Sequence, residues 1–215
     1  MKSFADLAGK TIAVPMRFSG HNVATRRLAQ EFGLLGNNLN IVEMNPPDMA
    51  SALATGAIDA YFVGEPFAAK AIQAGEGKVL HYVEEVWDGF ICNLLIVRQD
   101  LIDMHPDRVG SLVQGAARAG YWARSHPKEA AEIAGSYWNQ PADFVEYVLT
   151  TPPGRIVYDR FTPKQDEIQF LADEMQRFNL LETTNISGLA DERFARAANL
   201  DGITDLKSIL GPSNK

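Results

Sequence analysis

The chain has 215 residues, of which 46% are hydrophobic, 22% charged and 9% aromatic. This composition argues against a disordered chain, because enough apolar side chains are present to fill the core of one domain or of two small lobes. Acidic residues number 27 against 20 basic ones, for a formal net charge of -7, which disfavours nucleic acid or an anionic membrane as the main partner, since phosphate binding needs a positive field.

Short apolar segments alternate with short helical patterns through the first ninety residues. The predicted strands are Thr11–Pro15, Asn40–Met44, Asp59–Gly64, Lys78–Val83 and Phe90–Gln99. The helices predicted between them cover residues 20–35, 49–56 and 67–75. Strands joined by helices of this length imply right-handed crossovers, so we expect a three-layer α/β lobe with a mainly parallel sheet covered on both faces.

Helical patterns then occupy nearly all of the remaining chain. The predicted helices cover residues 105–124, 127–138, 141–149, 164–181 and 190–200, and several begin beside a proline, as helices often do. Each has an apolar stripe that must be buried. Either these helices pack around the small sheet, or they complete a second lobe whose strands lie outside this chain. The polar tail Gly211–Lys215 follows them.

The sequence contains few signs of covalent cross-links or of membrane insertion. Cys92 is the only cysteine, so this chain alone forms no intrachain disulfide and no thiolate-based metal site. It lies in an apolar run, where we expect a buried, inert thiol. The first thirty residues lack the apolar stretch of a secretory signal, and no run approaches the roughly 18 apolar residues that span a bilayer.

The junction Val14–Asn22 is the first candidate site. Ligands of parallel α/β sheets lie beyond the carboxyl ends of the strands, where a helix start offers free backbone N–H groups and partial positive charge. Ser19, Gly20 and His21 are therefore candidates to hold an anionic or polar group, with Phe18 beside them. The alternative is an ordinary N-cap followed by a small residue for close packing.

Two further candidates follow the next two strands. Glu65 and Phe67 stand at the end of the third strand, where Phe67 would form an apolar wall and Glu65 would face the same side as Ser19. Glu65 has an alternative role as a first-turn acid that stabilises its helix. Asn45, after the second strand, either contacts the ligand or only caps and turns the chain.

Enzymatic and metal-binding patterns are absent from the sequence. The four histidines are spread along the chain without an HExxH pair. There is no GxSxG elbow, no Walker loop and no GxGxxG. We therefore predict no catalytic residue, no metal site and no cofactor.

The order of several segments resembles a known family. DLAGKTIAVP, a Ser-Gly helix start, MNPPDMASALATGAIDAYFVGEPFAAKA and FICNLLIVRQDLIDMHPDRV follow one another as in the nitrate/sulfonate/taurine/bicarbonate class of ABC-transporter solute-binding proteins, which have the type II periplasmic-binding fold. The resemblance implies that residues 1–93 form lobe two of the family. Residues 94–215 would form the hinge return and the C-terminal helices of lobe one, without the N-terminal part of that lobe.

The resemblance also implies a function. We expect a small polar or anionic solute, such as nitrate, a sulfonate, taurine or bicarbonate, to bind in an interlobe cleft and to be delivered to ABC permease subunits. Such a protein is periplasmic or extracytoplasmic if an export signal precedes the given sequence, and otherwise cytoplasmic.

Two alternatives use the same fold. One is a cytoplasmic solute sensor that acts on a regulatory partner. The other is binding of a thiamine-pyrimidine precursor. The related pyrimidine synthases carry a cysteine-rich motif, which a chain with a single cysteine does not have.

Overall fold

The computed structural model describes residues 1–36 and 38–210, so the predicted polar tail lies outside the described residues. The chain divides into two compact units. Unit 1 comprises residues 1–93 and 166–186, and unit 2 comprises residues 94–165 and 187–215. The sequence left open whether the C-terminal helices pack around the sheet, and residues 166–186 do belong to unit 1.

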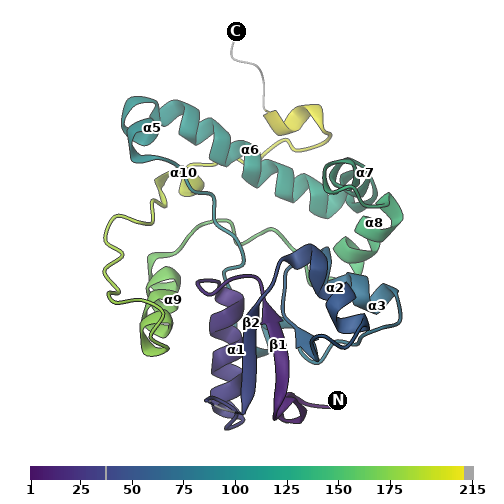
Figure 1. Ribbon diagram of the computed structural model, residues 1–215. Coiled ribbons are helices and arrows are strands. Elements are labelled where there is room, and N and C mark those ends of the chain that lie inside the picture. The colour runs from purple at the N-terminus through teal and green to yellow at the C-terminus, as the bar shows by residue number, and fades with distance from the viewer. Residues whose placement is uncertain (37, 211–215) are drawn as a thin grey trace. The chain divides into compact units, whose positions relative to one another are not determined.

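Unit 1 contains a parallel sheet, which in the described residues has three strands (Figure 1). Strand β1 (Lys10–Val14) lies between β2 (Leu39–Glu43) and β3 (Ala60–Tyr61). Ile12 is in register with Ile41 on one side and with Ala60 on the other. The last three residues of β1 are all buried, as expected for a central strand that is covered on both faces.

Helices cover both faces of this sheet, which gives three layers (Figure 1). On one face, Ile12 packs with Ala29 and Leu34, at and just beyond the end of helix α1 (Gly20–Glu31). On the other face, Ala13 packs with Met49 of helix α2 (Pro46–Ala54) and beside helix α3 (Phe67–Gln73). Successive side chains of a strand point to opposite faces, so one apolar strand serves both cores. The predicted three-layer α/β architecture is confirmed.

Helix α9 (Gln165–Arg177) packs against the outer side of α1. Val23 and Ala24 of α1 share an apolar cluster with Met175 and Phe178, and Trp87, just after the short helix α4 (Val83–Val86), joins it. Because the stripe of α9 is buried here, this helix needs no sheet of its own.

Three predicted strands differ from the structure. Only Ala60 and Tyr61 of the third segment pair with β1. Residues 78–82 are irregular and Val83 begins α4, and residues 90–98 are unpaired chain before Gln99, where helix α5 begins. A strand requires a hydrogen-bonded neighbour, and none of the described residues provides one here. Cys92, which we expected to be buried, is exposed.

Unit 2 is helical in its described residues. Its helices are α5 (Gln99–Met104), α6 (Pro106–Ser125), α7 (Pro127–Trp138), α8 (Ala142–Thr150) and α10 (Arg193–Arg196), followed by the 3₁₀ helix η2 (Lys207–Leu210). Proline occupies the first position of α6 and of α7, where its missing N–H leaves no hydrogen bond unmade. The helices predicted at 105–124, 127–138 and 141–149 are confirmed to within a residue or two.

A buried arginine joins α6 to the end of unit 2. Arg118 is 5% exposed. Its guanidinium donates four hydrogen bonds of 2.8 to 3.0 Å to backbone carbonyls. The accepting residues are Asn199, Asp201, Ser208 and Ile209. These bonds connect residues about ninety positions apart and compensate for the burial of the charge.

Candidate functional site

The strand order β2-β1-β3 places a topological switch point at the carboxyl end of β1. The chain leaves β1 toward β2 through α1, and it later reaches β3 on the opposite side of β1. In open α/β sheets the ligand crevice lies at such a point. The predicted junction Val14–Asn22 therefore stands where the topology favours a ligand.

Ser19 is the N-cap of α1. Its hydroxyl oxygen accepts a hydrogen bond from the Asn22 amide at 3.2 Å and donates to the Met16 carbonyl at 2.8 Å. Among the described residues, nothing accepts a hydrogen bond from the amides of Gly20 or His21. The two amides, together with the partial positive charge of the helix end, leave two donors for a polar or anionic group.

Positive charge lies near the same helix end. Arg17 is exposed one residue before the predicted contact Phe18, which is itself 56% exposed. The pKa of Arg26, in the second turn of α1, is lowered first by burial and second by the charge of Arg17. Arg26 donates to the Asn22 side chain at 3.0 Å. The Glu43 carboxylate accepts a hydrogen bond from the Arg17 amide at 2.7 Å, so two guanidinium groups and one carboxylate lie near the free amides.

The predicted contacts Gly20 and His21 are covered by aromatic rings. A Cβ added at Gly20 would lie 3.0 Å from the Phe90 ring and 3.3 Å from the Ile91 carbonyl oxygen. The His21 imidazole is buried, with ring centroids 4.8 Å from Phe62 and 5.5 Å from Phe90. Burial lowers the pKa of His21 to about 4, so its side chain is a neutral packing group.

The other predicted site residues lie at the ends of the neighbouring strands. Glu65 accepts a hydrogen bond from the Ala69 amide at 3.0 Å, which is the helix-stabilising role that the sequence left open. Phe67 is partly buried and belongs to the core beneath α2 and α3. Asn45 is the exposed N-cap residue of α2 and makes no side-chain capping bond. The structure thus joins Ser19, Gly20 and His21 at the start of α1, whereas Asn45 stands at the start of α2 and Glu65 and Phe67 at the start of α3.

Sequence reasoning missed the aromatic side chains that enclose the helix start. Phe62 follows β3, and its amide donates to the Ala13 carbonyl at 2.9 Å. Phe90 follows the Trp-Asp-Gly turn after α4. Neither has a local signal that would identify it, because the contact with α1 is made across more than forty residues.

A cavity of about 350 Å³ lies in unit 1, and Phe90 and Ile91, which contact Gly20, are among the residues that line it. Its walls include Trp87, Phe90 and Phe170. None of the seven predicted site residues is among the residues that line it.

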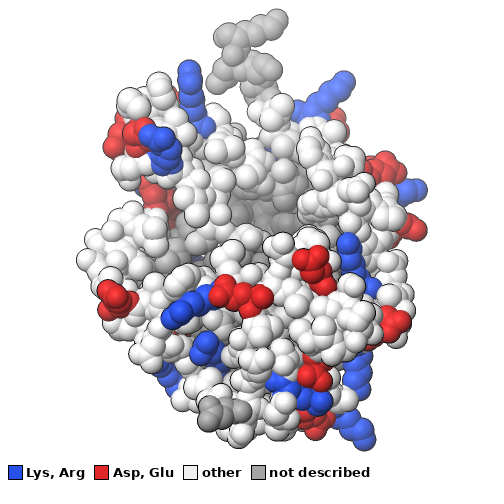
Figure 2. Space-filling view, viewed as in Figure 1, with Lys and Arg blue, Asp and Glu red and all other residues white. Residues whose placement is uncertain are grey.

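The described residues supply few groups for other chemistry. Among them, no group of three or more His, Cys, Asp or Glu side chains is placed to hold a metal ion. No helix in the described part of the chain is both long and apolar enough to cross a bilayer. On the face drawn in Figure 2, basic and acidic side chains are interspersed rather than gathered into a basic patch.

Comparisons with known proteins agree with this fold. The model of the NMT1-like family matches residues 2–136. A putative aliphatic sulfonates-binding protein of Bacillus subtilis (strain 168) is 30% identical over 132 residues, which cover 60% of this chain and 40% of the relative. The taurine-binding periplasmic protein of Escherichia coli (strain K12) is 33% identical over 116 residues, which cover 53% and 35%. The chain thus spans less than half the length of these relatives.

Solved structures show the same fold. The ligand binding component of an ABC-type import system from Staphylococcus aureus superposes with a TM-score of 0.79 at 22% identity, over 90% of this chain and 65% of that one. The desulfurization enzyme DSZB superposes with a TM-score of 0.54 at 18% identity, over 91% and 71%. The fold therefore occurs in both binding proteins and an enzyme, while the two curated relatives named above are binding proteins.

Proposed function

Since the chain belongs to the NMT1-like family, we propose that it binds a small polar or anionic solute, such as nitrate, a sulfonate, taurine or bicarbonate, and catalyses no reaction. The observation that carries this proposal is the start of α1. It stands at the switch point of the sheet and presents the free amides of Gly20 and His21 beside two guanidinium groups. Backbone amides at a helix start bind anions without needing a charged side chain of their own.

The names of the relatives support the class of solute. One relative is named for aliphatic sulfonates and another for taurine, and a sulfonate offers three oxygens to such donors. As part of the same proposal, the solute is delivered to the permease of an ABC importer, outside the cytoplasm. Residues 1–93 would correspond to lobe two of the family, and residues 94–215, of which 166–186 pack within unit 1, would contribute the hinge return and helices of lobe one.

The proposal is tested by replacing the N-cap with residues that differ only in charge. Aspartate and asparagine both cap helices as well as serine does, so Ser19→Asp and Ser19→Asn leave α1 intact. The aspartate places a carboxylate at the amides of Gly20 and His21, and it competes with the solute for them.

Binding is measured by calorimetry with nitrate, bicarbonate, taurine and an alkanesulfonate. We expect at least one anion to bind the unchanged protein, Ser19→Asn to bind within about threefold of it, and Ser19→Asp to bind at least about tenfold more weakly. Equal affinity of the two variants, or no binding by any anion, would overturn the proposal.

A further inference from the structure

Arg26 of α1 is a partly buried guanidinium that has no acidic partner among the described residues. Its Nε donates a hydrogen bond of 3.0 Å to Oδ1 of Asn22, one turn earlier on the same helix. Neither Nη atom is buried without a partner, so both reach solvent. A guanidinium that is fixed at Nε and open at both Nη groups matches the paired oxygens of a carboxylate or a sulfonate.

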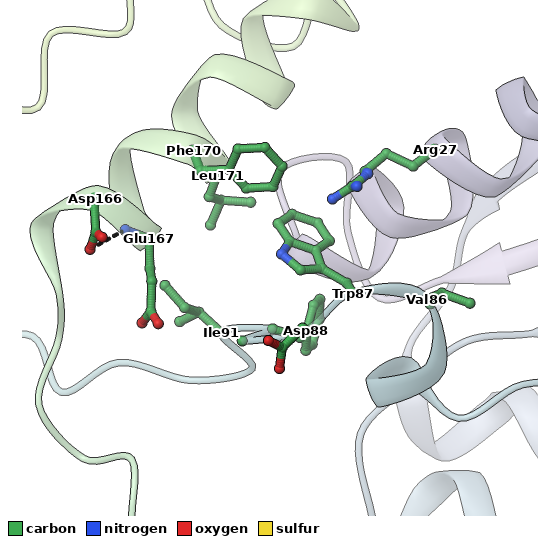
Figure 3. A pocket seen from close by; sticks show the side chains of 11 residues that line it. Arg27, Val86, Trp87, Asp88, Ile91, Asp166, Glu167, Phe170 and Leu171 are labelled. Atoms are coloured by element: carbon green, nitrogen blue, oxygen red, sulfur yellow. Dashed lines mark hydrogen bonds between the residues drawn. The ribbon is translucent and has the colours of Figure 1, made fainter.

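The next residue of α1 is an arginine with partners of its own. The Arg27 guanidinium lies 4.7 Å from the centroid of the Trp87 ring and 5.1 Å from that of the Phe170 ring (Figure 3). Its Nε lies 3.4 Å from Oε2 of Glu174, a carboxylate that it shares with a second arginine. Arg27 therefore has two rings and part of a carboxylate, whereas Arg26 has only a neutral amide.

Asn22 connects Arg26 to a second guanidinium. Asn22 is 2% exposed, and its Nδ2 donates to the Arg17 carbonyl at 2.7 Å while its Oδ1 accepts from Arg26. Arg17 is exposed, and its guanidinium lies 5.6 Å from the centroid of the Phe18 ring. In the described part of the chain, no carboxylate pairs with either guanidinium. One buried amide side chain thus holds together two positively charged residues.

One carboxylate stands close to this pair. Glu43, at the end of β2, accepts a hydrogen bond from the Arg17 amide at 2.7 Å. It forms no ion pair with a guanidinium of the described residues, so two positive charges face one nearby negative charge. Holding two like charges close together costs free energy, which a bound anion would recover.

We propose that Arg17 and Arg26 bind a second anionic group of the solute, which is therefore a short dianion such as a sulfonate that also carries a carboxylate. The inference rests on the proposed function, because the other anionic group meets the amides of Gly20 and His21. One helical turn of about 5.4 Å separates the first turn of α1 from Arg26, and helix side chains lean toward the N-terminus. A two-carbon chain between the anionic groups spans this separation.

Three sulfonates with the same two-carbon chain test the charge of the second group. Sulfopropionate ends in a carboxylate, isethionate in a hydroxyl and taurine in an ammonium. Their affinities for the full chain are measured by calorimetry at constant ionic strength. We expect sulfopropionate to bind at least about tenfold more tightly than isethionate, and taurine at least about threefold more weakly, because its ammonium faces two guanidinium groups. The ratio of the sulfopropionate and isethionate affinities measures the charge preference of the site.

Variants of the two arginines identify the groups responsible. Arg17→Gln changes an exposed side chain, so the fold is kept, and the charge preference should fall about threefold. Arg26→Gln keeps a side-chain donor for Asn22 and removes the charge, and the preference should fall at least about fivefold. Arg26→Lys keeps the charge without the paired N–H groups, and it should restore part of the preference.

The matched control is Lys78→Gln, which removes one positive charge from an exposed position of unit 1. Lys78 lies near Asp6, which precedes the start of β1, whereas Arg17 follows the end of that strand. The charge preference of this variant should stay within about twofold of that of the unchanged protein.

Equal affinity of the unchanged protein for sulfopropionate and isethionate would contradict the dianion proposal. A charge preference that persists in both Arg17→Gln and Arg26→Gln, or that falls as far in Lys78→Gln, would contradict it as well. If isethionate binds, and binds less tightly to Ser19→Asp, but sulfopropionate gains nothing, the anion site stands and only the dianion preference fails. If none of the three sulfonates binds, both proposals fail.

Discussion

Units 1 and 2 bury the apolar faces of their helices in different ways. In unit 1, a sheet lies between α1 and the pair α2 and α3, so each helix has an apolar surface to pack against. Unit 2 has only helices in its described residues and leaves large apolar side chains such as Leu95, Ile96 and Tyr137 more than half exposed. In unit 2 the buried Arg118 guanidinium makes four hydrogen bonds to backbone carbonyls. A helical layer without a sheet thus depends more on specific hydrogen bonds than a layered α/β core does.

The largest expected effect concerns this arginine. Arg118→Met removes four hydrogen bonds that a buried guanidinium donates to backbone carbonyls, so we expect the free energy of unfolding of unit 2 to fall by about 3 to 5 kcal/mol. Hydrogen exchange resolved by peptide should show loss of protection in α6 and in residues 199–210, with unit 1 unchanged. The control is Arg124→Met on the same helix, which breaks only an exposed 3.6 Å ion pair with Asp159 and should cost less than about 1 kcal/mol. Equal losses in the two variants would contradict a special role for Arg118.

In unit 1 the corresponding buried polar group is His21, and its effect depends on pH. Its pKa is lowered from 6.5 to about 4 in the folded chain because burial disfavours the charged ring. The unfolded chain therefore binds the proton more tightly, and stability that is fully present above pH 6.5 is lost as the pH falls toward 4. The loss amounts to about 3 kcal/mol.

The measurement is urea unfolding followed through Trp87 across this pH window. His21→Phe keeps an aromatic ring and removes the titration, so its stability should be much less dependent on pH between 6.5 and 4. The pKa of the Asp59 carboxyl is lowered first by the hydrogen bond from the Thr11 amide and then by Lys10. Asp59 therefore titrates below the pH window in which His21 acts. An identical pH slope in His21→Phe and the unchanged protein would show that another group is responsible.

The smallest expected effects come from replacing one glycine in each unit by alanine. Gly20→Ala places a methyl group 3.0 Å from the Phe90 ring, and we expect a loss of about 1 to 2 kcal/mol because the ring has to shift. Gly115→Ala, in the middle of α6, meets no atom within 4 Å and should stabilise unit 2 by about 0.5 to 1 kcal/mol. Thermal unfolding of both variants checks that the two changes in stability have opposite signs. A stabilising Gly20→Ala would contradict the close contact between Gly20 and the Phe90 ring.

The local features of the site were predictable because they depend on neighbouring residues. Ser19 caps α1 as its position before a Gly-His-Asn start indicated. Pro127 begins α7 as expected. The apolar run of β1 was correctly predicted as a buried strand, and the structure makes it the central one. The side chains that surround the helix start were not predictable, since the approach of Phe90 to Gly20 joins positions seventy residues apart.

The sequence alone determined the parallel α/β lobe, the position of its first helix and the absence of recognised catalytic motifs, because periodicity, caps and motif spacing are local properties of the chain. Tertiary structure decided which apolar segments became strands, since pairing needs a hydrogen-bonded neighbour in space. It also decided that residues 166–186 pack on α1, that Arg118 holds the end of unit 2, and that a cavity with aromatic walls lies beside α9. Each of these depends on contacts between distant residues, which neither composition nor spacing reports.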